Sequence, residues 1–157
     1  MSAISLPKPT RIAPIGSETT GLSFATLHLT QSPDAEVTIY DTRPDLKAYI
    51  KETLPGYLST LCPTQTPPSL HSSDRLTLAA GLATAVSTAD IIQEQGPETP
   101  LLQTVHLATT PPAPPASPAS TQAINMRDKS RLIVVHPYNP PHIMPLLELV
   151  PGSNTTG

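Results

Sequence analysis

The chain has 157 residues, with 13% charged side chains, 21 prolines, one phenylalanine, no tryptophan and a formal net charge of −3. This length suits a single domain with one core, although the many prolines and few aromatic side chains indicate that part of the chain does not join that core. The slightly negative charge argues against nucleic acid or an anionic membrane as a partner, and the single cysteine excludes an internal disulfide framework.

The N-terminal part of the chain alternates apolar runs with an amphipathic stretch, as expected for a parallel α/β sheet. An apolar run over 12–15 predicts a buried strand, although Pro14 has no amide hydrogen to donate inside a central strand. Apolar residues from 22 to 29 predict a helix that packs on the sheet. A β-branched run over 37–40, closed by Asp41, predicts the second strand.

A second helix is expected from about residue 42 to 54, where Pro55-Gly56 should end it. The shorter elements that follow are expected to be a loop over 62–73, a strand over 76–78, a helix over 82–86 and a strand over 90–94. The order strand, glycine loop, helix, strand and helix is that of a mononucleotide-binding half. The sequence therefore predicts the α/β class, with a Rossmann-type doubly wound parallel sheet.

A glycine-containing loop follows the first predicted strand. In a dinucleotide fingerprint the first glycine makes the tight turn, the second lets the backbone approach the pyrophosphate, and the third lets the helix pack closely on the strand. Gly16 and Gly21 hold the first and third places, whereas Glu18 holds the second. Two glycines at this spacing mark many strand-to-helix turns, but Asp41 at the end of the next strand is what a ribose hydroxyl requires. The pattern predicts a dinucleotide site that the charge of Glu18 weakens.

The segment over 131–151 holds a second signature. Its apolar run ends at His136, prolines hold the next turn open, and Glu148 follows where it could fold back towards the imidazole. A histidine at a strand end is more often structural than catalytic, and Glu148 alone could be a solvated helix residue. Together with the glycine loop, however, the pair indicates proton transfer, because imidazole accepts a proton near pH 7 and a carboxylate stabilises the resulting cation.

With both signatures present, the chain resembles the NAD-binding domain of 3-hydroxyacyl-CoA dehydrogenases, over about residues 10–103 and 119–153. The motif His-Pro-Tyr-Asn-Pro-Pro over 136–141 is especially similar to that of the L-gulonate 3-dehydrogenase and lambda-crystallin branch of the family. The resemblance implies an oxidoreductase that oxidises a 3-hydroxyl group to a ketone, with hydride passing to NAD. It leaves open whether the substrate is a 3-hydroxyacyl-CoA or a 3-hydroxy sugar acid.

The same resemblance implies roles for individual residues. His136 matches the family's histidine that takes the hydroxyl proton, and Glu148 matches the glutamate that orients and charge-balances it. Asp41 matches the ligand of the adenosine ribose, and Glu98 matches a contact on the nicotinamide side. Gly16 and Gly21 would belong to the loop that binds the pyrophosphate.

The expected organisation has five parts: a tail over 1–9, an NAD-binding Rossmann portion over 10–103, a Pro-rich linker over 104–120, the end of the Rossmann domain over 121–151 and a tail over 152–157. The linker contains five prolines and is expected to be extended and disordered. After it, a short helical piece over 121–124 and a buried strand over 132–135 should resume the sheet.

Two departures from the family pattern open an alternative. The linker replaces a Ser/Thr-rich strand end, for which Ser117 and Ser120 are poor substitutes, and we expect the family's helical C-terminal domain, which forms its dimer interface, to be absent. The chain could thus be a non-catalytic remnant that binds another protein. With no apolar stretch of about 20 residues and no leader-like start, we expect a cytoplasmic protein without membrane contact.

The remaining histidines and the cysteine give no further site. His28 is expected on a helix surface, His71 and His106 in loops, and His142 facing solvent or the family's second domain. No His/Cys/Asp/Glu cluster has the spacing of a metal site, and Cys62 has no basic neighbour in sequence that would activate a thiol.

Overall fold

The structure is a computed structural model that describes residues 8–95, 128–152 and 154–155. The chain divides into two compact units, one made of residues 1–95 with 140–143 and the other of residues 96–139 with 144–157. The linker over 104–120, the helical piece over 121–124, His106 and Glu98 lie outside the described residues. Within the part that is described, no helix is both long and apolar enough to cross a membrane.

The first unit is built on a four-stranded parallel sheet. Its strands are β1 (Thr10–Ile15), β2 (Ala35–Ile39), β3 (Leu76–Leu78) and β4 (Ile91–Glu94), in the order β3-β2-β1-β4. All three strand pairs are parallel. This order confirms the predicted Rossmann-type topology, and its direction of winding reverses between β1 and β4, where such sheets bind their ligands.

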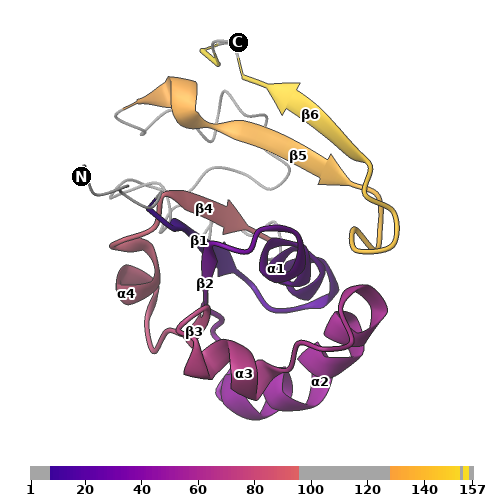
Figure 1. Cartoon of the computed structure of the whole chain (residues 1–157). Helices are drawn as coiled ribbons and strands as arrows, with labels where there is room; N and C mark the ends of the chain where they lie inside the picture. The colour runs from indigo at the N-terminus through magenta and orange to yellow at the C-terminus, as the bar shows by residue number, and fades with distance from the viewer. Residues whose placement is uncertain (1–7, 96–127, 153, 156–157) are drawn as a thin grey trace, which may run out of the picture. The chain divides into compact units, whose positions relative to one another are not determined.

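The helices of this unit are α1 (Thr19–Gln31), α2 (Leu46–Leu61), α3 (Pro67–Ser72) and α4 (Leu82–Val86). Helices α1 and α2 lie on one side of the sheet and α4 lies on the other (Figure 1). The predicted doubly wound arrangement is therefore confirmed.

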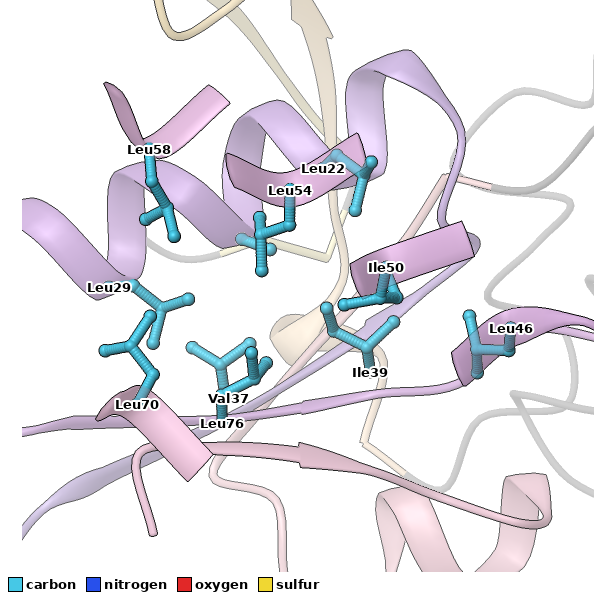
Figure 2. Close-up of a cluster of buried hydrophobic side chains, with 11 residues drawn as sticks. Leu22, Leu29, Val37, Ile39, Leu46, Ile50, Leu54, Leu58, Leu70 and Leu76 are labelled. Atoms are coloured by element: carbon cyan, nitrogen blue, oxygen red, sulfur yellow. The ribbon is translucent and has the colours of Figure 1, made fainter. Parts of the chain in front are cut away.

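The main core lies between the sheet and helices α1 to α3 (Figure 2). It joins apolar residues that recur at helical spacing with residues that alternate along the strands. Its members are Leu22, Ala25, Leu29, Val37, Ile39, Leu46, Ile50, Leu54, Leu58, Leu70 and Leu76. A smaller cluster of Ala13, Ile15, Ala79 and Ala85 packs on the other side, beneath α4. Both faces of β1 are thus buried from Ile12 to Ile15, as expected in a parallel sheet, whereas Ile91 and Ile92 of the edge strand β4 are exposed.

Pro14 does lie in the central strand, and the sheet adapts to it. The ladder between β1 and β2 stops after Ile12↔Val37 and resumes as a single bridge at Ile15↔Tyr40. The ladder between β1 and β4, in contrast, continues through Pro14. Because the carbonyl of Pro14 accepts from the Tyr40 amide at 3.1 Å, the missing amide hydrogen interrupts only the β2 side.

The prediction that Pro55-Gly56 ends the second helix is wrong. Helix α2 continues through Pro55 to Leu61. Leu54 and Leu58 are fully buried on its core side, whereas Pro55 is exposed, so water can satisfy the carbonyl that loses its amide partner. Burial of a leucine side chain, worth about 1.5–3 kcal/mol, offsets most of the cost of the proline. The predicted loop over 62–73 likewise contains α3, which begins at Pro67 with a capping box on Thr66.

The second unit contains an antiparallel hairpin. A short 3-10 turn, η2 (Lys129–Arg131), precedes β5 (Ile133–Pro137), which pairs with β6 (Leu147–Pro151). The predicted buried strand over 132–135 is therefore a strand that begins one residue later, but it is half-exposed and antiparallel. Its apolar run alone could not distinguish a buried parallel strand from one strand of a hairpin.

An ion pair links β1 to the start of β4. The carboxylate of Asp90 accepts from the Arg11 amide at 3.0 Å, from Nε at 3.1 Å and from Nη2 at 3.0 Å. These hydrogen bonds from Arg11 hold the pKa of Asp90 well below its usual range. The pair lies at the opposite end of these strands from the glycine loop and serves the fold.

Replacing Asp90 with asparagine should lower the thermal midpoint at pH 7, and the difference from the wild type should shrink as the pH falls below about 4. The folded-state pKa lies below the unfolded value of about 3.9, so ionisation of Asp90 stabilises the fold above that value. This stabilisation is lost as the pH falls towards the folded-state pKa. Thermal melts of both proteins at several pH values, with Asp34→Asn as an exposed control, test this; a difference that is constant with pH would contradict it.

Candidate dinucleotide-binding site

The glycine loop connects β1 to α1 at the carboxyl end of the sheet. Gly16 has φ of 103°, a left-handed conformation that side chains rarely adopt, and its amide donates to the Tyr40 carbonyl at 2.9 Å. The first place of the predicted fingerprint thus needs glycine for its backbone conformation.

Gly21 needs to be glycine for a different reason. A Cβ at this position would overlap the carbonyl oxygen of Gly16 and lie 2.9 Å from its carbonyl carbon. The first turn of α1 therefore packs directly on the loop backbone, which is the role expected of the third glycine in a dinucleotide fingerprint. Because glycine has no Cβ, α1 can approach the loop this closely. Such close packing is expected of a loop that holds a pyrophosphate.

Glu18, at the second place, is the N-cap of α1. Its φ of −74° is one that any residue adopts, so the backbone does not need glycine here. The carboxylate is exposed and makes no capping hydrogen bond. Its negative charge at a helix N-terminus competes with the attraction of that terminus for a phosphate.

Asp41 directly follows Tyr40 at the end of β2 and is tied to the loop. Its Oδ2 accepts from the amide of Ser17 at 2.7 Å and from the hydroxyl of Ser17 at 2.6 Å, while Oδ1 accepts from the amide of Arg43 at 3.0 Å. Burial opposes ionisation, but the hydrogen bonds from Ser17 and Arg43 outweigh it and lower the pKa of Asp41. Asp41 is therefore an anion at neutral pH, held in place against the glycine loop.

The surroundings of Asp41 favour a free ribose over a phosphorylated one. A fixed carboxylate accepts hydrogen bonds from hydroxyl groups and repels a 2′-phosphate. The guanidinium of Arg43, which could otherwise neutralise such a phosphate, pairs with Asp45 at 2.8 Å and stacks 3.5 Å from the ring centre of Tyr49. The residues present therefore fit NAD.

Sequence reasoning missed Ser17, which joins the loop to the acid. Its side chain is fully buried, and both its amide and its hydroxyl donate to Asp41. A hydroxyl residue directly after the first glycine was the available signal, but only the fold reveals its partner, because Asp41 lies 24 residues away in the chain.

His136 and Glu148 are brought together in the second unit. They are directly opposite residues of the β5–β6 ladder, and both are exposed. Opposite residues of an antiparallel pair share one face of the sheet, with Cβ atoms about 4.5–5.5 Å apart. The expectation that Glu148 folds back towards the imidazole agrees with this register, whereas the reading of Glu148 as a helix residue is wrong.

Three of the other histidines differ from expectation, His142 and His28 in their burial and His71 in the element that holds it. His142 belongs to the first unit, where its Nδ1 is 2.8 Å from the hydroxyl of Ser23 and its ring is 4.8 Å from that of Tyr57. It is half-buried rather than solvent-facing, and burial lowers its pKa. His28 is also half-buried, with Nε2 2.8 Å from Gln93 Oε1, and His71 lies in α3. Among the described residues, no group of three or more His, Cys, Asp or Glu could hold a metal ion.

Residues 11–157 match the family model of the 3-hydroxyacyl-CoA dehydrogenase NAD-binding domain. The chain belongs to the 3-hydroxyacyl-CoA dehydrogenase family. It is similar to the L-carnitine dehydrogenase of Streptomyces coelicolor, with 33% identity over 92% of this chain and 48% of that protein. It is also 35% identical to a 3-hydroxyacyl-CoA dehydrogenase of Gibberella moniliformis, over 48% of this chain and 27% of that protein. The chain spans about half the length of the curated relatives that cover most of it.

Solved structures of the same fold include 3-hydroxybutyryl-CoA dehydrogenase from Escherichia coli, with a TM-score of 0.72, 20% identity and coverage of 96% of this chain and 34% of that one. Another is an NAD⁺-dependent 5-formyl-3-hydroxy-2-methylpyridine 4-carboxylic acid 5-dehydrogenase, with a TM-score of 0.73, 21% identity and coverage of 94% and 50%. At these identities the likeness supports the fold alone. The predicted family and its NAD-binding character are confirmed, but the relatives named here do not bear out the predicted L-gulonate 3-dehydrogenase branch.

Proposed function

We propose that the chain is the NAD-binding part of a dehydrogenase that oxidises the 3-hydroxyl group of a small 3-hydroxy acid to a ketone. The main support for this proposal is that Ser17 connects the glycine loop to Asp41. Its amide and its hydroxyl donate to Asp41 Oδ2, at 2.7 and 2.6 Å. An ionised acceptor fixed beside such a loop is what the adenosine ribose of NAD requires. Membership of the dehydrogenase family supports the same assignment.

In this proposal His136 accepts the proton of the substrate hydroxyl, and Glu148 stabilises the imidazolium that forms. Their opposite places in the β5–β6 ladder support this pairing, because directly opposite residues of an antiparallel pair share one face of the hairpin. NAD, when bound, supplies the acceptor for the hydride that leaves the carbinol carbon. The products are a ketone and a protonated histidine, which returns its proton to solvent.

The substrate class is supported by the relatives rather than by a pocket. Several curated relatives are L-carnitine dehydrogenases, and carnitine is itself a 3-hydroxy acid, so a small 3-hydroxy acid of this kind is our leading candidate. A 3-hydroxyacyl-CoA is the second candidate, because one relative is a 3-hydroxyacyl-CoA dehydrogenase. A sugar acid fits the same chemistry, but no relative named here supports it.

An NMR titration with NAD tests the binding on which this function rests. We expect NAD to bind with a Kd of about 1 mM, and Asp41→Asn to weaken binding at least about tenfold, since the ribose loses its charged acceptor. NADP should bind more weakly than NAD to the wild type. Asp41→Asn should reduce the ratio between the affinities for NAD and NADP. Asp34→Asn, an exposed change of equal charge, should leave both affinities unaltered. Equal affinities of the wild type and Asp41→Asn for NAD would contradict the assignment.

A protein-binding remnant is the second candidate, and one observation favours it. The second unit exposes several large apolar side chains in and beside its hairpin, among them Tyr138, Leu146, Leu147 and Leu149. A two-stranded hairpin is marginally stable in water by itself, and a contiguous apolar surface often binds another protein. Failure of the wild type to bind NAD would favour this candidate over the dehydrogenase.

A further inference from the structure

Gln95 follows the last residue of β4, at the carboxyl end of the sheet where the winding reverses. Its amide donates to the carbonyl of Ile15 at 2.9 Å, so its backbone continues the pairing of β4 with β1. This placement brings its side chain to the glycine loop, which follows Ile15. The Oε1 atom of Gln95 lies 3.4 Å from the position that a Cβ on Gly21 would take.

The side-chain amide of Gln95 has no hydrogen-bond partner among the residues that the structure describes. Both Oε1 and Nε2 are buried, and neither is hydrogen-bonded. A carboxamide offers two donors and one acceptor, and leaving such a group buried and unpaired costs its full desolvation penalty. Most buried polar groups in folded proteins are paired, so an amide with both ends unpaired suggests a missing partner.

The position of this amide indicates the kind of partner. It lies against the loop that the family uses for NAD, and a dinucleotide backbone carries both phosphate oxygens, which accept, and ribose hydroxyls, which also donate. A neutral donor is of particular use here, because Glu18 brings negative charge to the same loop and removes part of its attraction for phosphate.

We propose that Gln95 is a dinucleotide-binding residue whose side-chain amide makes with bound NAD the hydrogen bonds that it lacks in the free protein. This inference rests on the proposed NAD binding and assigns a new contact within it. The hydrogen bonds to NAD account for the presence of a buried amide that is left unpaired in the free protein.

The test is Gln95→Met, which keeps the length of the side chain and removes its hydrogen-bonding groups. Without NAD, the variant should be as stable as the wild type or more stable in urea, because an unpaired buried amide has been replaced by an apolar group. Its affinity for NAD, from NMR titration, should be at least tenfold lower. In the wild type, the side-chain amide signals that disappear in Gln95→Met should be among those that NAD shifts most.

Gln65→Met is a matched control, because Gln65 also has a buried, unpaired Oε1 but lies between α2 and α3. It should leave the affinity for NAD unchanged. Three results would overturn the inference: equal NAD affinity of Gln95→Met and the wild type, tighter binding by the variant, which would make the amide an obstruction, or a less stable free variant. In each of these cases NAD binding by the wild type would still support the proposed function, whereas no binding by the wild type would overturn both.

Discussion

Replacing Gly21 with alanine should destabilise the first unit by about 3 kcal/mol, the upper end of the usual cost of over-packing, and should abolish detectable NAD binding. The added Cβ would overlap the carbonyl oxygen of Gly16 and lie 2.9 Å from its carbonyl carbon. Both are backbone atoms of the loop, so no side-chain rotation relieves the contact, and either α1 or the loop must move. Urea unfolding gives the stability, and an NMR titration gives the affinity.

Gly56→Ala is the matched control for this prediction, because a Cβ there meets nothing within 4 Å. Gly56 is an exposed interior residue of α2, so alanine should stabilise the chain by about 0.5–1 kcal/mol and leave NAD binding unchanged. The same chemical change thus has opposite effects at two positions. If Gly21→Ala retained the stability and NAD affinity of the wild type, the close packing of α1 on the loop could not be what shapes the site.

The sequence predicts the sheet well because its signals are local. The apolar run before Gly16, the β-branched run before Asp41 and the glycine spacing are read within single elements, and the structure confirms the elements that they predict. The parallel order also follows, since a strand, helix and strand in succession allow few other connections.

The errors in prediction arise where distant contacts override a local signal. Proline predicts the end of a helix, yet α2 passes through Pro55 because Leu58 is buried against residues far away in the chain. An apolar run predicts a buried strand, yet β5 is half-exposed because its partner is β6 and not the parallel sheet.

The candidate site was predictable in its residue types but not in its connections. Gly16, Gly21 and Asp41 belong to a pattern with known spacing, so the sequence was enough to select them. Ser17 and Gln95 belong to no such pattern. Their importance depends on what folding brings beside them, which is Asp41 for Ser17 and the glycine loop for Gln95.

Replacing Glu18 with glycine should raise the affinity for NAD at least about tenfold, equivalent to about 1.4 kcal/mol. A carboxylate about 5 Å from a phosphate opposes binding by roughly 3 kcal/mol at an effective dielectric of about 20. Since Glu18 is exposed, solvent and salt screen part of this repulsion, and only part of it is recovered. The fold should tolerate the change, because Glu18 makes no capping hydrogen bond and glycine is an acceptable N-cap.

Two further variants separate charge from size at this position. Glu18→Gln removes the charge but keeps a long side chain, so its gain in affinity measures repulsion alone, and that gain should diminish as salt is added. Glu52→Gln changes the net charge equally on the exposed face of α2 and should leave the affinity unaltered. If Glu18→Gly, Glu18→Gln and the wild type bound NAD equally, the phosphates would not lie at the N-terminus of α1. The role of the glycine loop in holding NAD would then have to be abandoned, because Glu18 is the N-cap residue of that helix.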